Sequence, residues 1–236
     1  MTRVRIVGPG RAGTSLHRAL SRAHWPVAPL IGRGEDLRGA ARDVDLVVIA
    51  TPDAAVAEVA AAIDPNAPVV VAHLSGSLGL AALAPHQRRA VLHPLVALPD
   101  PERGEDRLVG AWFGLAIEGD PLIEEVVDEL HGRVVRIAES SWARYHAAAV
   151  IAANHLVALL GQVERIAETV GAPLEAYLDL ARGALDDVAA LGPAAALTGP
   201  VRRGDIDTVE RHVAALPEPE RAAYRALAEE ARRLCR

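Results

Sequence analysis

The chain has 236 residues, enough for one large domain or two smaller ones, and 51% of them are hydrophobic, which is enough to form a core. Its formal net charge of −6 argues against nucleic acid as a partner, and the absence of lysine excludes a lysine Schiff base or general acid. The single cysteine, Cys235, excludes a disulfide framework and a cysteine cluster, so no metal site is expected.

The longest apolar run covers residues 147–160 and is interrupted by Asn154 and His155. It is too short to span a bilayer, and no signal peptide is expected before the first strand. We therefore expect a soluble cytoplasmic protein with no membrane partner.

A glycine-rich turn follows the first predicted strand, residues 4–7. Gly8 permits a tight turn, Gly10 lets the backbone approach a pyrophosphate, and Gly13 lets the next helix, 14–22, lie close to the strand. This G-x-G-x-x-G spacing between a strand and a helix predicts a dinucleotide site. The residues expected to bind the cofactor here are Gly8, Pro9, Gly10, Arg11, Ala12 and Gly13.

A short second strand is predicted over residues 26–31, and Arg33 follows it. An acid at this place accepts from the 2′-hydroxyl of NAD, whereas an arginine suits the 2′-phosphate of NADP. Arg33 therefore favours NADP(H). If the strand is two residues longer, Glu35 or Asp36 takes the position instead, and Arg33 is then a solvated loop charge.

A strand is predicted over residues 45–50, with the continuous apolar run Leu46-Val47-Val48-Ile49, which is typical of a strand buried on both faces of a parallel sheet. Alternation of such strands with helical stretches predicts a doubly wound α/β sheet of Rossmann-like type. Further strands are predicted at 69–72, 90–92, 112–118 and 132–137, helices at 54–63 and from Pro121, and a surface loop at 99–110.

Ligands of such sheets lie beyond the carboxyl ends of the strands. The cofactor-binding candidates at these ends are Thr51, Pro52 and Asp53. His73 and Ser75 are candidates to bind substrate, and His93 is a candidate proton donor, because imidazole exchanges protons near pH 7. The alternatives are histidines that hydrogen-bond at strand ends and a serine that only forms the turn beside Gly76.

From residue 139 the strand pattern is absent, and alanine and leucine dominate. We expect a dinucleotide-binding domain at 1–138 and a helical substrate and dimerisation domain at 139–236. A helix is predicted over 142–170, and in regular helix geometry His146 and Asn154 lie about 80° apart, so both can line one cleft. Asn154 could instead bond to a neighbouring helix, and Tyr145 and His155 are interpreted as structural.

Further helices are predicted at 174–191, 205–216 and 219–233. The loop at 196–205 contains Arg202 and Arg203, and a guanidinium group can hold a carboxylate or phosphate with two hydrogen bonds. Arg203 is therefore a candidate substrate-binding residue, although both arginines could equally be solvated.

Several of these stretches together resemble a family of NADP-dependent oxidoreductases that join a Rossmann-like domain to a helical domain. The matching stretches are the glycine turn, residues 73–77, His93-Pro94-Leu95, the helix at 145–150 with Asn154, and residues 196–200 with 203–205. The family is similar to the 6-phosphogluconate-dehydrogenase-like superfamily, which includes pyrroline-5-carboxylate reductase, ketopantoate reductase and prephenate dehydrogenase.

The resemblance implies a homodimer built by a helical domain of the 6-phosphogluconate dehydrogenase C-terminal type, with the active site between the domains. His93-Pro94-Leu95 is similar to the His-Pro-Met of prephenate dehydrogenases, so the resemblance implies that His93 contacts the oxygen on the carbon involved in hydride transfer. Many relatives place a lysine four residues before the asparagine that Asn154 matches, but here position 150 is valine, so His146 or His93 would replace it as proton donor.

The leading hypothesis is an NADP(H)-dependent oxidoreductase that transfers hydride to a small carbonyl or imine, with a 2-oxo acid such as ketopantoate as the first test. In it His93 donates the proton, Asn154 and Ser75 hold the carbonyl, and Arg203 binds the carboxylate. The alternative is a non-catalytic NADP(H)-binding sensor or partner-docking protein, which the missing lysine favours.

Overall fold

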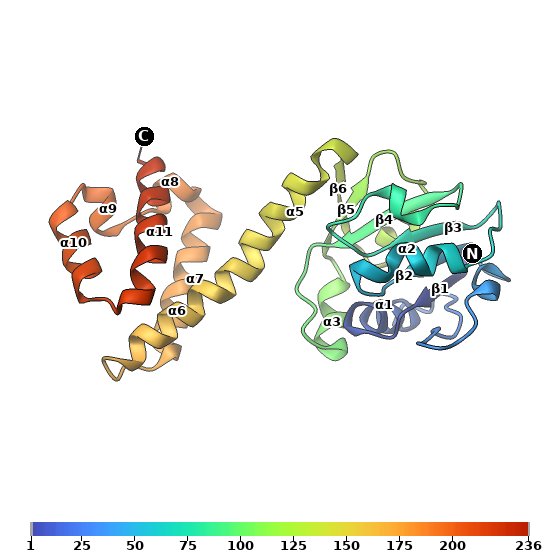
Figure 1. Ribbon diagram of the computed structural model, residues 1–236, viewed down its shortest axis with the longest axis horizontal. Coiled ribbons are helices and arrows are strands. Elements are labelled where there is room, and N and C mark those ends of the chain that lie inside the picture. The colour runs from blue at the N-terminus through green and yellow to red at the C-terminus, as the bar shows by residue number, and fades with distance from the viewer. Residues whose placement is uncertain (1, 236) are drawn as a thin grey trace. The chain divides into compact units, whose positions relative to one another are not determined.

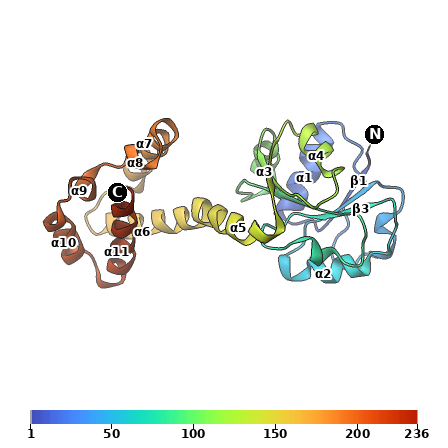
Figure 2. The same ribbon diagram turned by 90° about the horizontal axis from the view of Figure 1, so that it is seen from above.

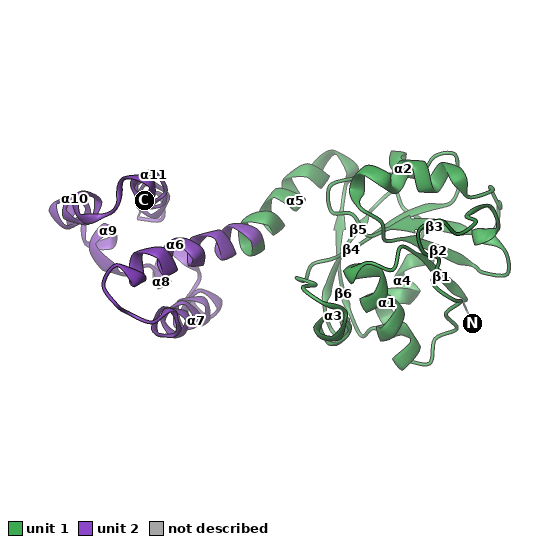
Figure 3. Ribbon diagram, turned by 60° about the horizontal axis from the view of Figure 1, so that its bottom comes forward, with its two compact units in different colours: residues 1–153 green, residues 154–236 purple. Residues whose placement is uncertain are grey.

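The computed structural model describes residues 2–235, and its contacts divide the chain into two compact units, Met1–Ala153 and Asn154–Arg236 (Figure 3). The first unit contains a mixed α/β sheet domain, and the second consists of helices. This confirms the expected fold class, a Rossmann-like sheet followed by an all-helical region. The boundary expected between residues 138 and 139 stays a prediction.

The first unit is built on one six-stranded sheet in the order β1-β2-β3-β4-β5-β6 (Figure 1). All neighbouring strands are parallel except β4 and β5, which are antiparallel with His93 opposite Gly114. The carboxyl ends of β1 to β4 therefore share one edge of the sheet. The strands are β1 (Val4–Val7), β2 (Leu46–Ile49), β3 (Val70–His73), β4 (Arg89–Pro94), β5 (Trp112–Ala116) and β6 (Arg133–Ile137).

Helices cover both faces of this sheet, as expected for a doubly wound fold (Figure 2). Side chains alternate along each strand, so Ile6 and Val48 pack with α1, α3 and α4, while Val47 and Ile49 pack with α2 on the opposite face. Burial on both faces explains why β2 is apolar at every position. The helices of this unit are α1 (Arg11–Arg22), α2 (Asp53–Ala62), α3 (Pro101–Leu108), α4 (Ile123–Glu129) and α5 (Trp142–Val150).

The segment 26–31 does not form the predicted strand. It runs beside β1 and makes only two isolated bridges, Val4 to Val27 and Val7 to Ile31. Ala28 N–H donates to the Val4 carbonyl, but the next donor to β1 is Ile31 rather than Leu30, so the regular pairing is interrupted. Residue 33 is still carried to the carboxyl edge, because Gly8 N–H donates to the Ile31 carbonyl at 2.9 Å.

The surface loop predicted over 99–110 is also wrong, because this stretch contains α3. The Asp100 side chain caps the helix by accepting a hydrogen bond from Arg103 N–H at 2.8 Å, and Pro101 stands at its first turn. Gly104 and Leu108 are buried where α3 packs against α1. The many charged residues form the solvent face of an amphipathic helix, which the sequence interpretation took for a loop.

One long helix, Glu139–Glu168, replaces the single regular helix expected at 142–170. It contains a π-helical turn at Ile151–His155, between α5 and α6 (Leu156–Glu168). Among the described residues, this helix alone is long and apolar enough to cross a membrane by length and composition. Its mean hydropathy is 1.4, and only 6% of the apolar window is buried. This is weak evidence for a membrane span, because helices of soluble proteins have the same composition.

The second unit is held together by polar as well as apolar contacts. Gln162 Nε2 donates to the Glu220 carbonyl at 2.9 Å, and Arg165 forms two hydrogen bonds to the Glu220 carboxylate. Asp205 caps α10 by accepting a hydrogen bond from Thr208 N–H at 3.0 Å. The helices after α6 are α7 (Leu174–Leu191), α8 (Pro193–Ala196), α9 (Gly199–Arg203), α10 (Ile206–Ala215) and α11 (Arg221–Arg233).

Candidate functional site

A pocket of about 490 Å³ lies at the glycine turn, at the carboxyl edge of the sheet. It is bounded by the end of β1, the segment after Ile31 and the loop between β2 and α2. The predicted cofactor residues that line it are Gly8, Pro9, Gly10, Arg33, Thr51 and Pro52. Arg11, Ala12 and Gly13 form the first turn of α1, and Asp53 is the first residue of α2.

The three glycines of the turn have different surroundings. Gly8 has a φ of +106°, and a Cβ there would lie 2.9 Å from the Ala50 carbonyl carbon. A Cβ on Gly13 would overlap the Gly8 carbonyl oxygen. Nothing lies closer than 4.0 Å to a Cβ on Gly10. Packing therefore requires glycine at positions 8 and 13, whereas at position 10 the space is left for a ligand.

The polar groups around this pocket fit the pyrophosphate of a dinucleotide. No side chain caps the N-terminus of α1 and no acidic residue stands in its first turn, so its N–H donors and the helix dipole are available to an anion. The Thr51 hydroxyl is buried and has no hydrogen-bond partner among the described residues. A bound ligand would satisfy both features.

Arg33 and Glu35 both line the pocket at the place where an adenosine ribose is recognised. Both residues are exposed, and the Glu35 carboxylate accepts a hydrogen bond from Gly32 N–H. The Glu35 carboxylate is thus hydrogen-bonded to the backbone of its own loop. Arg33 makes no side-chain hydrogen bond in the described structure, so its guanidinium is available to a phosphate.

His73 is completely buried at the end of β3, and its two ring nitrogens bond to the backbone of the following loop. Ser75 N–H donates to Nδ1 at 3.2 Å, so the Nε2–H donates to the Gly79 carbonyl, also at 3.2 Å. Burial lowers the pKa of His73 and keeps it neutral, against the opposing effects of Gly79 and Asp53. The ring therefore fixes the loop, and neither nitrogen faces a substrate.

Ser75 and Ser77 form a short hydrogen-bonded chain in the same loop. The buried Ser75 hydroxyl accepts from Ser77 N–H at 3.1 Å and lies 3.2 Å from the Ser77 hydroxyl. Ser77 in turn donates to the Asp53 carboxylate at 2.5 Å. These contacts favour a turn-forming role for Ser75 and join the β3 loop to the start of α2.

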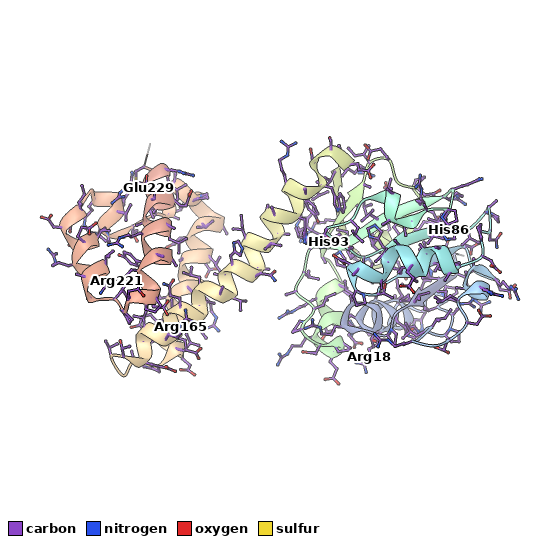
Figure 4. The ribbon with its side chains drawn as sticks, in the orientation of Figure 1. Arg18, His86, His93, Arg165, Arg221 and Glu229 are labelled. Atoms are coloured by element: carbon purple, nitrogen blue, oxygen red, sulfur yellow. The ribbon has the colours of Figure 1, made fainter. Side chains whose placement is uncertain are left out.

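His93, labelled in Figure 4, lies near the end of β4 and meets two side chains of α5. Its Nδ1 is 2.8 Å from the Tyr145 hydroxyl oxygen, and its ring makes an edge-to-face contact with His146, with centroids 5.5 Å apart. The buried His146 Nδ1 has no hydrogen-bond partner among the described residues. The structure thus brings together His93 and His146, the two residues that the sequence analysis names as alternative proton donors.

The surroundings of His93 disfavour its charged form. Burial lowers the pKa of His93 to about 4, and the nearby His146 and His73 act in the same direction while Asp53 opposes them. Burial also raises the pKa of Tyr145 to about 12. At neutral pH His93 is therefore an uncharged imidazole, which can donate one N–H and accept at the other nitrogen.

Asn154 and Arg203 are both exposed and belong to the second unit, and the described structure gives neither of them a side-chain hydrogen bond. Asn154 lies in the π-helical turn rather than in a regular helix, so the 80° separation from His146 does not apply. Their roles in substrate binding stay predictions. Among the described residues, no group of three or more His, Cys, Asp or Glu side chains could hold a metal ion.

The sequence analysis did not identify Tyr145 as a site residue. It also did not identify Gly76 and Gly114, whose missing side chains leave room for aromatic rings of the site. A Cβ on Gly114 would lie 2.6 Å from the Tyr145 Cζ, and a Cβ on Gly76 would lie 2.6 Å from His93 Nε2 and overlap His146. The adjacent pair Tyr145-His146 on one helix was a usable signal. The two glycines gave no usable signal, because glycine occurs inside strands and turns for many structural reasons.

Gly76→Ala is expected to separate His93 from His146, because both rings occupy the space of the added methyl group. If His93 and His146 have the proton-donor role expected from the sequence, kcat should fall at least about tenfold, since small displacements of such groups are costly, while cofactor affinity stays unchanged. Steady-state kinetics with calorimetry of NADPH binding measures both. Gly183→Ala on α7 is the control, because a Cβ there meets nothing within 4 Å. A normal kcat in Gly76→Ala would contradict a proton-donor role for His93 and His146.

Comparison with known proteins places these features in context. A family model described as a domain of unknown function (DUF2520) matches residues 114–231. None of the curated protein sequences is similar enough to count as a relative. The match covers half of the chain and carries no description of a reaction.

Three solved structures share the fold over nearly the whole chain. A provisionally named NADP oxidoreductase from Bacteroides fragilis has a TM-score of 0.82 and 20% identity, covering 98% of each chain. A reductive aminase from Aspergillus terreus, in complex with NADPH and ethyl levulinate, has a TM-score of 0.73 and 17% identity, covering 99% of this chain and 94% of its own. Pyrroline carboxylate reductase from Plasmodium falciparum, with NADP bound, has a TM-score of 0.65 and 12% identity, covering 100% and 98%.

Proposed function

Because the chain belongs to the family defined by the domain of unknown function DUF2520, whose description names no reaction, we propose its function from its own site. We propose that it is an NADP(H)-dependent oxidoreductase of the 6-phosphogluconate-dehydrogenase-like superfamily that reduces a small carbonyl or imine. The observation that carries this proposal is the position of the dinucleotide pocket and the His93 cluster at one carboxyl edge of the same sheet.

The cofactor assignment is supported by the uncapped α1, the open space at Gly10 and the unpartnered Thr51 hydroxyl. The first turn of α1 would hold the pyrophosphate, and Arg33 would hold the 2′-phosphate that distinguishes NADP from NAD. The similar reductive aminase and pyrroline carboxylate reductase were both solved with this cofactor. Bound there, the nicotinamide supplies the hydride.

The chain's own residues supply the proton and hold the substrate. His93 would donate from Nε2 to the oxygen or nitrogen of the reduced bond, with His146 as the second candidate donor. Asn154 would hold the carbonyl, and Arg203 would bind a carboxylate in the case of a 2-oxo acid. His73 would contribute indirectly by fixing the loop that carries Ser75 and Gly76.

The test is to incubate the protein with NADPH and a panel of 2-oxo acids, with ketopantoate first, and cyclic imines, and to follow nicotinamide absorbance. Oxidation of NADPH with one panel class, and weaker activity with NADH, supports the proposal. Arg33→Ala should reduce the preference for NADPH over NADH. Tight NADPH binding without turnover of either class would favour the non-catalytic sensor, which the absence of lysine makes the second candidate.

We further propose that the protein is a cytoplasmic homodimer formed through its helical region. The window of helix Glu139–Glu168 with mean hydropathy 1.4 is only 6% buried within one chain, and α7 exposes Leu180, Leu185 and Leu191. A soluble protein covers so much apolar surface with a partner. Sedimentation at several concentrations tests this; a monomer at all of them would refute it.

A further inference from the structure

We propose, on the basis of the reductase function above, that Tyr145 is the positioning residue of His93. Its hydroxyl donates to Nδ1, which fixes the ring proton on Nε2, the nitrogen that lies over Gly76 beside His146. The geometry further assigns Gly114 as the position that makes room for this contact.

The direction of the hydrogen bond follows from the partners of the two groups. The Tyr145 oxygen lies 2.8 Å from His93 Nδ1 and makes no other hydrogen bond in the described structure. If His93 donated instead, the Tyr145 hydroxyl would have no acceptor for its own proton among the described residues and would depend on solvent for one. Donation by Tyr145 satisfies both groups, and neutral imidazole then carries its single proton on Nε2.

The position of the tyrosine ring is fixed from two sides. Gly114 is paired with His93 across β4 and β5, and the ring of Tyr145 lies against its Cα, where a side chain would stand. On α5, the buried Trp142 packs against Tyr145 with ring centroids 5.2 Å apart. Packing therefore places the Tyr145 hydroxyl against His93, and the tyrosine side chain is not free to adopt other, exposed rotamers.

Both partners stay neutral over a wide pH range, which keeps this arrangement intact. The titratable groups that act on His93 are Asp53, which favours its charged form, and His73 and His146, which disfavour it together with burial. Burial also keeps the Tyr145 hydroxyl protonated. Between the two pKa values, about 4 and about 12, the pair has one proton on each partner.

The same contact provides a source for the proton that His93 gives up. As the N–H bond at Nε2 breaks and an O–H or N–H bond forms on the substrate, the Tyr145 proton passes to Nδ1. The imidazole thus remains neutral, and the Tyr145 oxygen takes up a solvent proton in the same step, because burial disfavours a free tyrosinate; the net proton consumed comes from solvent. The reduced nicotinamide cofactor is the only reductant in this scheme.

The protonation of His93 can be measured without substrate by ¹⁵N NMR of the histidine side chains in the full chain. In wild type we expect the proton on Nε2 and a hydrogen-bonded, unprotonated Nδ1. In Tyr145→Phe, which keeps the ring and its packing, the Nδ1 signal should shift to that of a free nitrogen, and a second tautomer should appear. His93→Gln assigns the resonance.

The matched control is Tyr224→Phe, because Tyr224 makes the same kind of contact to His212 Nδ1, at 2.7 Å, within the helical unit. It should change the His212 signal and leave His93 as in wild type. Kinetically, Tyr145→Phe should lower kcat by about 10- to 100-fold with little change in KM, whereas Tyr224→Phe should keep wild-type kcat.

A wild-type His93 with its proton on Nδ1, or an unchanged His93 signal in Tyr145→Phe, would overturn the proposal even if the protein reduces a panel substrate. If no substrate is reduced but the tautomer behaves as expected, the positioning contact stands and the proposed reaction is at fault. If Tyr145→Phe shifts the tautomer but keeps wild-type kcat, the contact has no role in the reaction and the proposal fails.

Discussion

His93→Ala is expected to lower kcat by about 10²- to 10⁴-fold while NADPH binds with nearly unchanged affinity. That range is the usual contribution of a positioned proton donor. Affinity should persist because the pocket at the glycine turn is lined by residues of β1, β2 and their loops, and His93 is not among them. Steady-state kinetics gives kcat, and calorimetric titration gives the NADPH dissociation constant.

His212→Ala is the control for this variant, because His212 is exposed and lies in the helical unit. It should retain kcat. Equal turnover in His93→Ala and wild type would remove His93 from the mechanism and leave His146 as the candidate donor. Loss of NADPH affinity together with kcat would instead indicate that His93 supports the cofactor.

The pH profile should distinguish a neutral donor from a charged one. With a pKa of about 4, His93 is unprotonated at Nδ1 throughout the range from pH 5 to 8. A charged imidazolium donor with an ordinary pKa would lose activity as pH rises through about 6.5. We expect no such step assignable to His93, so the profile of wild type should contain no inflection that disappears in His93→Gln.

Gly10→Ala is expected to weaken NADPH binding about 100-fold, or by roughly 2.7 kcal/mol, without unfolding the protein. Its φ of −75° suits alanine, and the nearest atom to the added Cβ is 4.0 Å away. The methyl group would occupy the space through which the backbone approaches a pyrophosphate. Calorimetry gives the affinity, and thermal unfolding without ligand checks stability.

Gly13→Ala provides the contrast, because its Cβ would overlap the Gly8 carbonyl oxygen and crowd Ala50. It should destabilise the free protein by roughly 1–3 kcal/mol or more, as overpacked positions do. NADPH should raise the melting temperature of wild type but not of Gly10→Ala at the same concentration. Undiminished binding in Gly10→Ala would remove the glycine turn from the cofactor site.

Much of the sheet could be predicted because its signals are local. The apolar run at β2 and the glycines after β1 determine a buried parallel strand and a tight glycine turn with little help from the rest of the chain. Residues 26–31 and α3 were misjudged for a different reason. The run at 26–31 looks locally like a strand but makes only two isolated bridges to β1, and a charged helix shows few apolar positions beyond Leu108.

The cluster of His93, Tyr145 and His146 was predictable only in part, because its geometry depends on contacts between distant residues. His93 stood out at the end of a strand, but the contact of Tyr145 with it joins positions 52 residues apart. The space at Gly114 results from pairing between β4 and β5, which no local pattern reveals. His73 illustrates the opposite error: its position suggested a ligand contact, and its hydrogen bonds to Ser75 and Gly79 give it a structural task.

The antiparallel pairing of β4 with β5 divides the sheet domain into two segments that could be exchanged separately between related proteins. Residues at the ends of β1 and β2 and in the loops after them line the pocket at the glycine turn, whereas residues 112–150 bring Gly114, Tyr145 and His146 to His93 on β4. A chimaera that exchanges 112–150 between members of the family should therefore acquire the donor's proton chemistry and keep the recipient's coenzyme preference. Exchange of that segment would leave the lining of the glycine-turn pocket unchanged, because none of its residues belongs to 112–150.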